Sequence, residues 1–194
     1  MIDTAPAKGK TVVLGLSTGK DSTATALALE EAGIEYRAIY ADTLWEHAST
    51  YEHLEYLREK LTAPIEVVQG PGFEALVRGR KMFPTRRRLP GGRNARFCTS
   101  ELKVIPIMGA IARLSGDDPD GVINPVGIRA QESRARSRLE PLELNESMGV
   151  LVWRPILDWT EEDVIAIHQV PQATDVRQHR PGKIEFKPPF RIAQ

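Results

Sequence analysis

The segment 17–22 has the sequence STGKDS, which combines two serine hydroxyls, a glycine and a lysine ammonium. It follows the apolar, β-branched run Thr11–Leu16 and precedes an alanine- and leucine-rich stretch, Thr23–Ala32, so the expected order is strand, loop, helix. In a loop between a strand and a helix, successive backbone N–H groups and the positive end of the helix dipole can bind one anion. The chemistry indicated is phosphate binding, although a serine-capped turn without a ligand would use the same residues.

Two familiar phosphate-binding motifs do not describe this segment. A Walker A loop has four residues between its glycines and then Lys-Ser or Lys-Thr. Only three residues separate Gly15 from Gly19, and Asp21 follows Lys20 where a magnesium-binding hydroxyl would stand. The GxGxxG pattern of dinucleotide-binding proteins is also missing.

Strand and helix patterns alternate after this loop. Gly33 is suited to end the first helix, and Glu35–Ala41 is the next strand. Ala48–Leu61 has apolar residues at helical spacing, and Ile65–Val68 is a third strand. This alternation predicts an α/β fold with a doubly wound, mostly parallel sheet and helices on both faces. Such sheets bind ligands at the carboxyl ends of their strands.

The second half continues this pattern around a basic loop. Segment 81–97 is rich in proline and glycine and carries five arginines with no acidic residue, so we expect an exposed loop. The other expected elements are a helix at Phe73–Arg80, a helix at Thr99–Leu114, a strand at Val122–Ile128, a polar insertion over 129–149, a strand at Val150–Ile156 and a helix capped by Thr160.

Composition restricts the class of protein. The 194 residues include 26 basic and 26 acidic side chains, so any anion-binding surface must be local. The single cysteine, Cys98, excludes an internal disulfide, and charges interrupt every apolar stretch before it reaches the length of a membrane span. We therefore expect a cytoplasmic protein without membrane contact, in which residues 1–169 form one nucleotide-binding α/β domain and 170–194 an irregular tail.

Further motifs follow the loop in a characteristic order: Asp42-Thr43 with Thr50-Tyr51, RFCT at 96–99 with Leu102-Lys103 and Pro106, Gly127-Ile128-Arg129 with Glu132-Ser133 and Arg136, and WRPILDW at 153–159. Segment 17–22 is similar to the SGGxDS loop of the PP-loop ATP pyrophosphatases, with Thr18 at a position that is usually glycine. Together these motifs resemble the phosphoadenosine phosphosulfate (PAPS) reductase-like branch of that superfamily, over Thr11 to His168. The resemblance implies an adenine nucleotide alpha hydrolase-like, Rossmann-like fold.

The resemblance also implies roles for the loop residues. Ser17, Thr18, Gly19 and Ser22 would bind nucleotide phosphates through backbone and hydroxyl donors, and Lys20 would neutralise their charge. Asp21 is the expected magnesium contact, because carboxylates beside this loop help to hold the ion in ATP-cleaving relatives. An equal alternative is that Asp21 caps the helix.

Other candidate residues come from the later motifs. Asp42 would accept a hydrogen bond from ribose or adenine, unless it caps the next helix. Because their segments should converge on the ligand edge, four cations are expected to hold a substrate anion there. The alternative is ordinary surface charge, with Glu132 pairing to a neighbouring arginine. The four cations are Arg96, Lys103, Arg129 and Arg136. Gly127 is expected at the same site. Lys20 and Arg129 are the expected catalytic residues.

The sequence departs from the reductases at its end, and three functions stay open. No cysteine follows Cys98, so the usual thiolate is missing and we expect no iron–sulfur cluster. The first function is ATP cleavage between the α and β phosphates, with Mg²⁺ and adenylyl transfer to an acceptor. The second is binding or reduction of (phospho)adenylyl sulfate with a partner's thiol. The third is a non-catalytic nucleotide-binding subunit, with a protein or nucleic acid bound through loop 81–96; a homo-oligomer is compatible with all three.

Overall fold

The computed structural model describes residues 1–85, 96–116, 118, 121–146 and 149–169. The expected tail over 170–194 and most of the basic loop lie outside these residues. Within the described ranges, no helix is long and apolar enough to cross a membrane.

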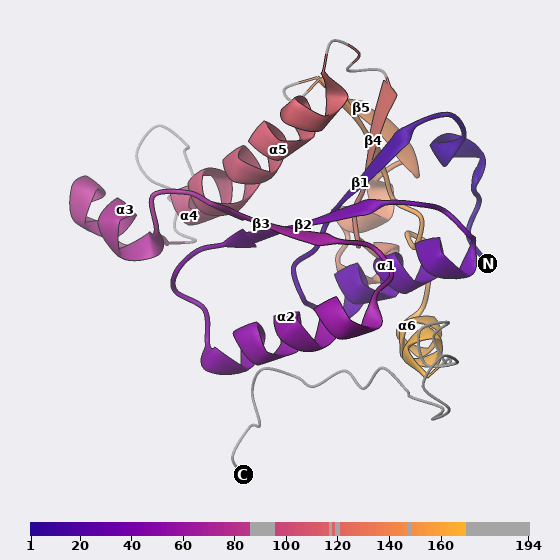
Figure 1. Ribbon diagram of the computed structural model, residues 1–194, viewed down its shortest axis with the longest axis horizontal. Helices are drawn as coiled ribbons and strands as arrows, with labels where there is room; N and C mark the ends of the chain where they lie inside the picture. Colours follow the sequence, from indigo (N-terminus) through magenta and orange to yellow (C-terminus); the bar gives the residue numbers. More distant parts are fainter. Residues whose placement is uncertain (86–95, 117, 119–120, 147–148, 170–194) are drawn as a thin grey trace.

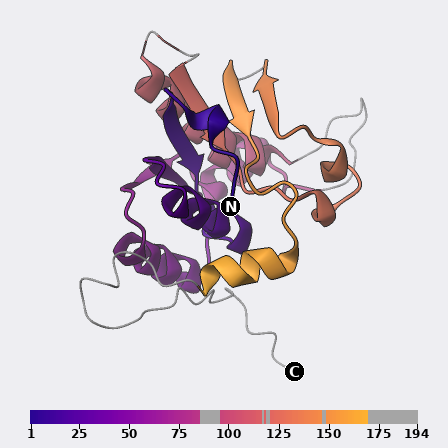
Figure 2. The same ribbon diagram turned by 90° about the vertical axis from the view of Figure 1, so that its right-hand side faces the viewer.

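The sheet contains six strands: β1 (Thr11–Gly15), β2 (Arg37–Asp42), β3 (Ile65–Gln69), β4 (Val122–Pro125), β5 (Leu142–Asn145) and β6 (Val150–Trp153). Their order across the sheet is β3-β2-β1-β4-β6-β5. Neighbouring strands run parallel, except that β5 pairs with β6 in the antiparallel sense. Figure 2 shows this antiparallel pair as two orange arrows at one end of the sheet.

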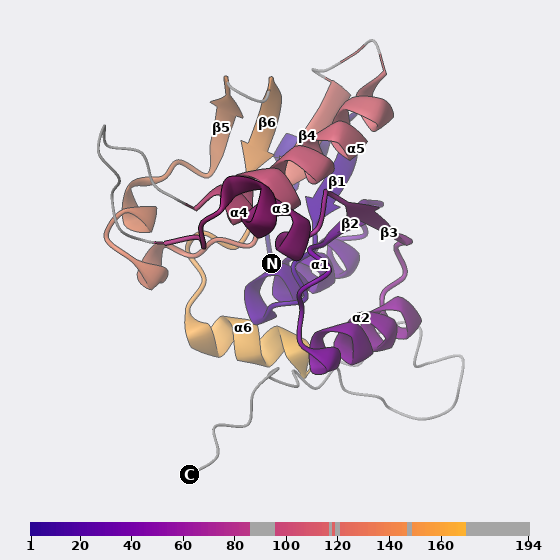
Figure 3. The same ribbon diagram turned by 90° about the vertical axis from the view of Figure 1, so that its left-hand side faces the viewer.

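Six α-helices are described: α1 (Lys20–Glu31), α2 (Ala48–Lys60), α3 (Phe73–Arg80), α4 (Phe97–Thr99), α5 (Ile105–Ser115) and α6 (Glu161–His168). Figures 1 and 3 both show α5 on the opposite side of the sheet from α1, α2 and α6. Because side chains alternate along a strand, Val12 and Leu14 pack with α1, while Val13 packs with Ile111 of α5. The structure thus confirms the predicted doubly wound α/β class.

Most of the predicted elements lie where their patterns indicate. Gly33 has φ +68° directly after α1, a conformation that glycine adopts without steric cost. Thr160 caps α6, because its hydroxyl accepts from the backbone N–H of Asp163 while the Asp163 carboxylate accepts from the backbone N–H of Thr160. The predicted N-cap of the last helix is therefore confirmed.

Two predicted elements need correction. The polar insertion over 129–149 contains β5, in which Glu143 lies between two leucines that are both largely exposed. This strand is only four residues long and its two leucines stay exposed, so the segment has the character of a polar insertion rather than of a strand that buries one face. The predicted helix at Thr99–Leu114 contains a π-helical turn at Ser100–Val104, just before Pro106, which has no N–H for the regular helical ladder.

The position of β1 in the sheet decides where a ligand can bind. The chain runs from β1 to β2 and β3 on one side, and β4 then lies on the other side of β1. Connections that leave a strand in opposite directions create the switch point at which open α/β sheets bind ligands, beyond the carboxyl ends of the strands. Segment 17–22 follows β1 directly and therefore lies at this point.

Candidate nucleotide-binding site

The loop after β1 is folded around the hydroxyl of Ser22. The Ser22 Oγ accepts from the backbone N–H of Ser17 at 3.2 Å, lies 2.9 Å from the Ser17 Oγ and donates to the Gly19 carbonyl at 3.0 Å. Gly19 is the N-cap of α1, and no side chain caps this helix. The N–H groups of the first turn have no acceptor inside the helix, so their positive end is available to an anion.

Thr18 has a backbone conformation that is unusual for its residue type. Its φ is +58°, in the left-handed region, and its side chain is buried. A β-branched residue adopts this conformation at a steric cost, which glycine would not have. This explains why the similar loops have glycine here, and it shows that the rest of the loop is strong enough to hold Thr18 in this geometry.

The segment after β4 approaches the first turn of α1 closely. A Cβ atom on Gly127 would lie 2.7 Å from the backbone of Asp21 and from the nitrogen of Ser22, so any side chain at Gly127 would collide with α1. One residue pair also joins the strands behind the loop, because the Asn124 Nδ2 donates to the Val13 carbonyl at 2.6 Å. The two sides of the switch point are therefore fixed against each other.

Arg129 is the predicted cation that contacts segment 17–22 in the described residues. Its side chain is buried, and its Nε donates to the Asp21 Oδ1 at 2.6 Å. Glu132 closes this turn, because its Oε2 accepts from the backbone N–H of Arg129 at 2.9 Å and pairs with the Arg136 guanidinium. Although burial acts in the opposite direction, these contacts hold the pKa of Glu132 below its ordinary value. Arg136 is thus paired with Glu132, the alternative that its sequence spacing left open.

Helix α6 contacts the loop through two residues, Glu161 and His168, that were not among the predicted functional residues. Glu161 forms an ion pair with Lys20, and the hydrogen bond and charge of Lys20 lower the pKa of Glu161. His168 is buried, and its Nε2 donates to the Lys20 carbonyl at 3.0 Å. The acidic first turn of α6 signalled a helix start, but no local pattern indicated which loop it would face.

Asp42 lies at the end of β2, the strand next to β1, and its carboxylate is already bonded. Its Oδ1 accepts from the Leu44 N–H and the Tyr51 hydroxyl, both at 2.8 Å, and its Oδ2 accepts from the Gln69 Nε2 at 3.1 Å. The N-cap of α2 is His47, so Asp42 does not cap that helix. Burial and the hydrogen bond to Asp42 raise the pKa of Tyr51.

The remaining predicted cations are spread along the ligand edge. Lys103 pairs with Glu46 beyond the end of β2, at 3.3 Å, and Arg96 is exposed at the start of α4. Cys98 packs beside Phe97 in a small apolar cluster. The four cations expected to converge thus occupy separate places, with Arg129 at the loop itself.

The described residues include no group of three or more His, Cys, Asp or Glu side chains that could hold a metal ion. Asp21 uses Oδ1 for Arg129, which leaves Oδ2 as the carboxylate oxygen that does not take part in this ion pair. This suits an ion such as Mg²⁺, which proteins often hold through one carboxylate together with substrate phosphates and water.

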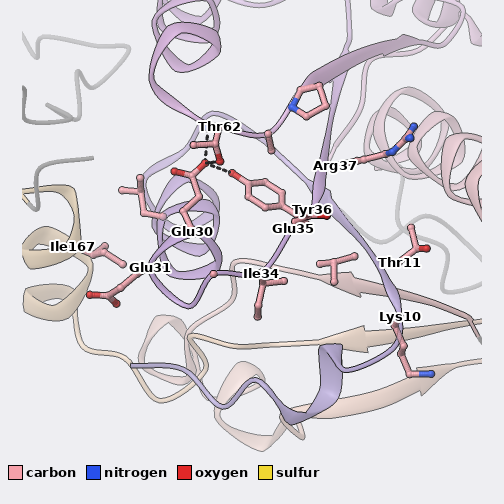
Figure 4. A pocket seen from close by; sticks show the side chains of 15 residues that line it. Lys10, Thr11, Glu30, Glu31, Ile34, Glu35, Tyr36, Arg37, Thr62 and Ile167 are labelled. Atoms are coloured by element: carbon pink, nitrogen blue, oxygen red, sulfur yellow. Dashed lines mark hydrogen bonds between the residues drawn. The ribbon is translucent and has the colours of Figure 1, made fainter. Parts of the chain in front are cut away.

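A separate hollow of about 990 Å³ lies at the opposite edge of the sheet, near the amino ends of β1 and β2 (Figure 4). Glu30 in this hollow accepts hydrogen bonds from the Tyr36 hydroxyl and from the backbone and side chain of Thr62. Because this is the carboxyl end of α1, where the helix dipole is negative, it does not favour phosphate.

A doubly wound sheet with an uncapped helix start at its switch point defines the class of Rossmann-like α/β proteins. The chain belongs to the phosphoadenosine phosphosulfate reductase domain family, whose model matches residues 11–174. The predicted family is therefore confirmed.

The chain is also similar to individual proteins and solved structures. An uncharacterised 37.8 kDa protein of Escherichia phage 186 is 30% identical over an alignment of 199 positions, which covers 80% of this chain and 59% of that protein. The chain thus spans less than two thirds of this relative. The crystal structure of the PAPS reductase of Candida auris in complex with phosphate superposes with a TM-score of 0.61 at 16% identity, covering 92% of this chain and 84% of that one. A predicted tRNA methyltransferase subunit of Methanocaldococcus jannaschii has a TM-score of 0.45 at 14% identity, covering 84% and 75%.

Proposed function

We propose that this chain binds ATP at segment 17–22 and cleaves it between the α and β phosphates, transferring the adenylyl group to an acceptor. The observation that carries the proposal is the uncapped start of α1 at the switch point, with the hydroxyls of Ser17 and Ser22 beside it. Backbone N–H groups and hydroxyls there would bind phosphate oxygens. Membership of the PAPS reductase domain family supports an adenine nucleotide as the ligand.

The residues around the loop would stabilise the charge that develops during cleavage. An acceptor oxygen or sulfur attacks the α phosphorus, the bond to the bridging oxygen breaks, and the electron pair leaves with pyrophosphate. Lys20 would exchange its contact with Glu161 for a phosphate oxygen, since both partners are partly exposed. Arg129, oriented by Asp21, would supply fixed positive charge beside the loop. Magnesium would supply further charge neutralisation, held through the Asp21 Oδ2.

The second candidate is binding of a sulfonucleotide such as PAPS. It is favoured by the family match and by the similarity in fold to the Candida auris PAPS reductase. The chain has no cysteine after Cys98, and Cys98 packs in an apolar cluster. Reduction would therefore use a thiol from a partner.

Calorimetric titration separates these candidates. The purified chain is titrated with ATP plus magnesium, with AMP and with PAPS, and each titration is repeated with Lys20→Ala. Lys8→Ala is the matched control, because Lys8 is exposed before β1, away from the loop. We expect ATP binding that Lys20→Ala weakens and Lys8→Ala does not. A preference for PAPS would support the second candidate, and binding without turnover would indicate a nucleotide-binding subunit. No binding of any nucleotide would contradict the site.

A further inference from the structure

Three aromatic side chains, of which Phe73 is half-buried and the other two exposed, form a group beyond the ends of β2 and β3, here called the aromatic shelf: Trp45, Phe73 and Phe83. The ring of Phe73 lies between the other two, with centroids 5.3 Å from Trp45 and 6.5 Å from Phe83. Trp45 is 63% exposed and Phe83 is 70% exposed. Large apolar side chains that gather in solvent typically mark a binding surface.

The aromatic shelf lies at the same edge of the sheet as the phosphate loop. Trp45 follows β2 and Phe73 follows β3, and Figure 1 shows α3, which begins at Phe73, beyond the ends of these strands. The backbone N–H of Phe73 donates to the Thr43 carbonyl at 2.9 Å, which joins the two segments. Since β2 is parallel to its neighbour β1, the shelf and segment 17–22 both lie at carboxyl ends of adjacent strands.

The turn that presents Trp45 is held in a costly conformation. Leu44 has φ +56°, and its backbone N–H donates to the Asp42 Oδ1 at 2.8 Å. The Leu44 side chain packs against Gly72, where an added Cβ would lie 3.2 Å from the Leu44 Cδ1. Strain of this kind persists where the surroundings enforce it, and it is common at binding sites. Core packing does not explain it, because Leu44 and Trp45 are both exposed.

Positive charge lies beside the aromatic shelf. Residues 77–100 contain eight basic side chains and no acidic one in the sequence, and four of the eight, Arg78, Arg80, Lys81 and Arg96, belong to the described residues. Two acidic residues from outside this stretch pair with cations in it, Glu74 with Arg78 and Glu101 with Arg80, and Glu46 pairs with Lys103, which follows the stretch. Lys81 and Arg96 are exposed and form no ion pair with the described residues. Among the described residues of this stretch, Lys81 and Arg96 therefore remain for an anionic partner.

We propose that the aromatic shelf binds unpaired bases of a single-stranded nucleic acid, with its phosphates on Lys81 and Arg96. This deepens the proposed function and rests on it, because it makes a nucleic acid the acceptor of the adenylyl group. Exposed rings beside unpaired cations match the two parts of a single strand, its bases and its backbone. An apolar protein segment would use the rings but leave both cations without a partner. A duplex keeps its bases stacked inside, out of reach of the rings.

Fluorescence anisotropy with a short labelled oligonucleotide of mixed sequence tests this proposal. We expect single-stranded DNA or RNA to bind more tightly than the duplex of the same sequence. Trp45→Ala and Phe83→Ala should each weaken binding about tenfold, the loss expected of one stacked base. Trp45→Phe should restore most of the affinity, because it keeps an aromatic face. The matched control is Ile165→Ala, which removes a 51% exposed apolar side chain from α6 and should change nothing.

Two further measurements separate this proposal from the nucleotide site. ATP titration of Trp45→Ala checks that the variant is folded, and Lys20→Ala should lose ATP affinity while keeping its affinity for the oligonucleotide. Equal binding of single strand and duplex would overturn the shelf proposal, as would an unchanged affinity in both Trp45→Ala and Phe83→Ala. Oligonucleotide binding without any ATP binding would contradict the adenylyl-transfer function and leave the shelf in place.

Discussion

The Nε of Arg129 donates a hydrogen bond to the Oδ1 of Asp21 at 2.6 Å, although 108 positions separate the two residues in the sequence. This pair of a buried arginine and a partly buried aspartate joins the segment after β4 to the first turn of α1. It fixes the guanidinium beside the loop and also restrains the Asp21 carboxylate. Both effects can be measured separately.

Arg129→Ala should destabilise the fold, because it leaves the Asp21 carboxylate partly buried without its partner. We expect a loss of about 3 kcal/mol in the free energy of unfolding, measured by urea denaturation. Asp21→Ala in the same background should recover part of this loss. If the two substitutions act additively in the double-mutant cycle, the pair is not coupled.

Gly127→Ala should disturb the loop directly, because the new methyl group would meet the backbone of Asp21 and Ser22. We expect a loss of about 2 kcal/mol in unfolding free energy and weaker ATP binding in calorimetry. Gly79→Ala is the matched control, since nothing lies within 4 Å of the added atom in α3. That control should be neutral or slightly stabilising. Equal effects of the two substitutions would contradict the close approach.

Glu161→Gln should release Lys20 from its ion pair and so strengthen phosphate binding. We expect ATP affinity to rise about threefold, with little change in stability, because the pair is solvent-exposed. Glu162→Gln removes the same charge from the next residue of α6 and should have a smaller effect. Unchanged affinity in Glu161→Gln would mean that Lys20 does not compete between the carboxylate and the nucleotide.

His168 should make stability depend on pH. Burial holds its pKa below the ordinary value, despite the opposing contact with the Lys20 carbonyl and the charge of Asp21. In the window just below about pH 6.5 the unfolded chain therefore binds more protons than the folded one. Stability contributed by neutral His168 is present above this window and is lost as the pH falls through it. In urea denaturation between about pH 5 and 7, His168→Gln should show a flatter profile, and an identical slope would contradict the burial effect.

The sequence was informative wherever one local pattern decided the structure. Short β-branched runs such as Thr11–Leu16 predicted the buried strands, and the polar loop after the first strand indicated where the candidate phosphate site lies. The edge strand β5 was not predicted. Its leucines, Leu142 and Leu144, stay exposed, so no face of the strand is buried. Its pairing with β6 depends on the rest of the sheet.

Contacts within the site were harder to foresee than its location. Spacing grouped Arg96, Lys103, Arg129 and Arg136 at one edge, but the acidic partner of each cation is decided by the tertiary fold. Lys103 meets Glu46 and Arg129 meets Asp21, which no local window contains. The roles of Lys20, Asp21 and Asp42 toward a nucleotide stay predictions.

The contacts of Lys20 have a consequence for the order in which the protein becomes competent during synthesis. The loop lies near the amino terminus, yet its partners Arg129, Glu161 and His168 belong to the last third of the described chain. A ribosome-bound fragment that ends before β4 would carry all of segment 17–22 without the residues that brace it. Nucleotide capture should therefore begin late in translation, after α6 has left the exit tunnel and docked on α1.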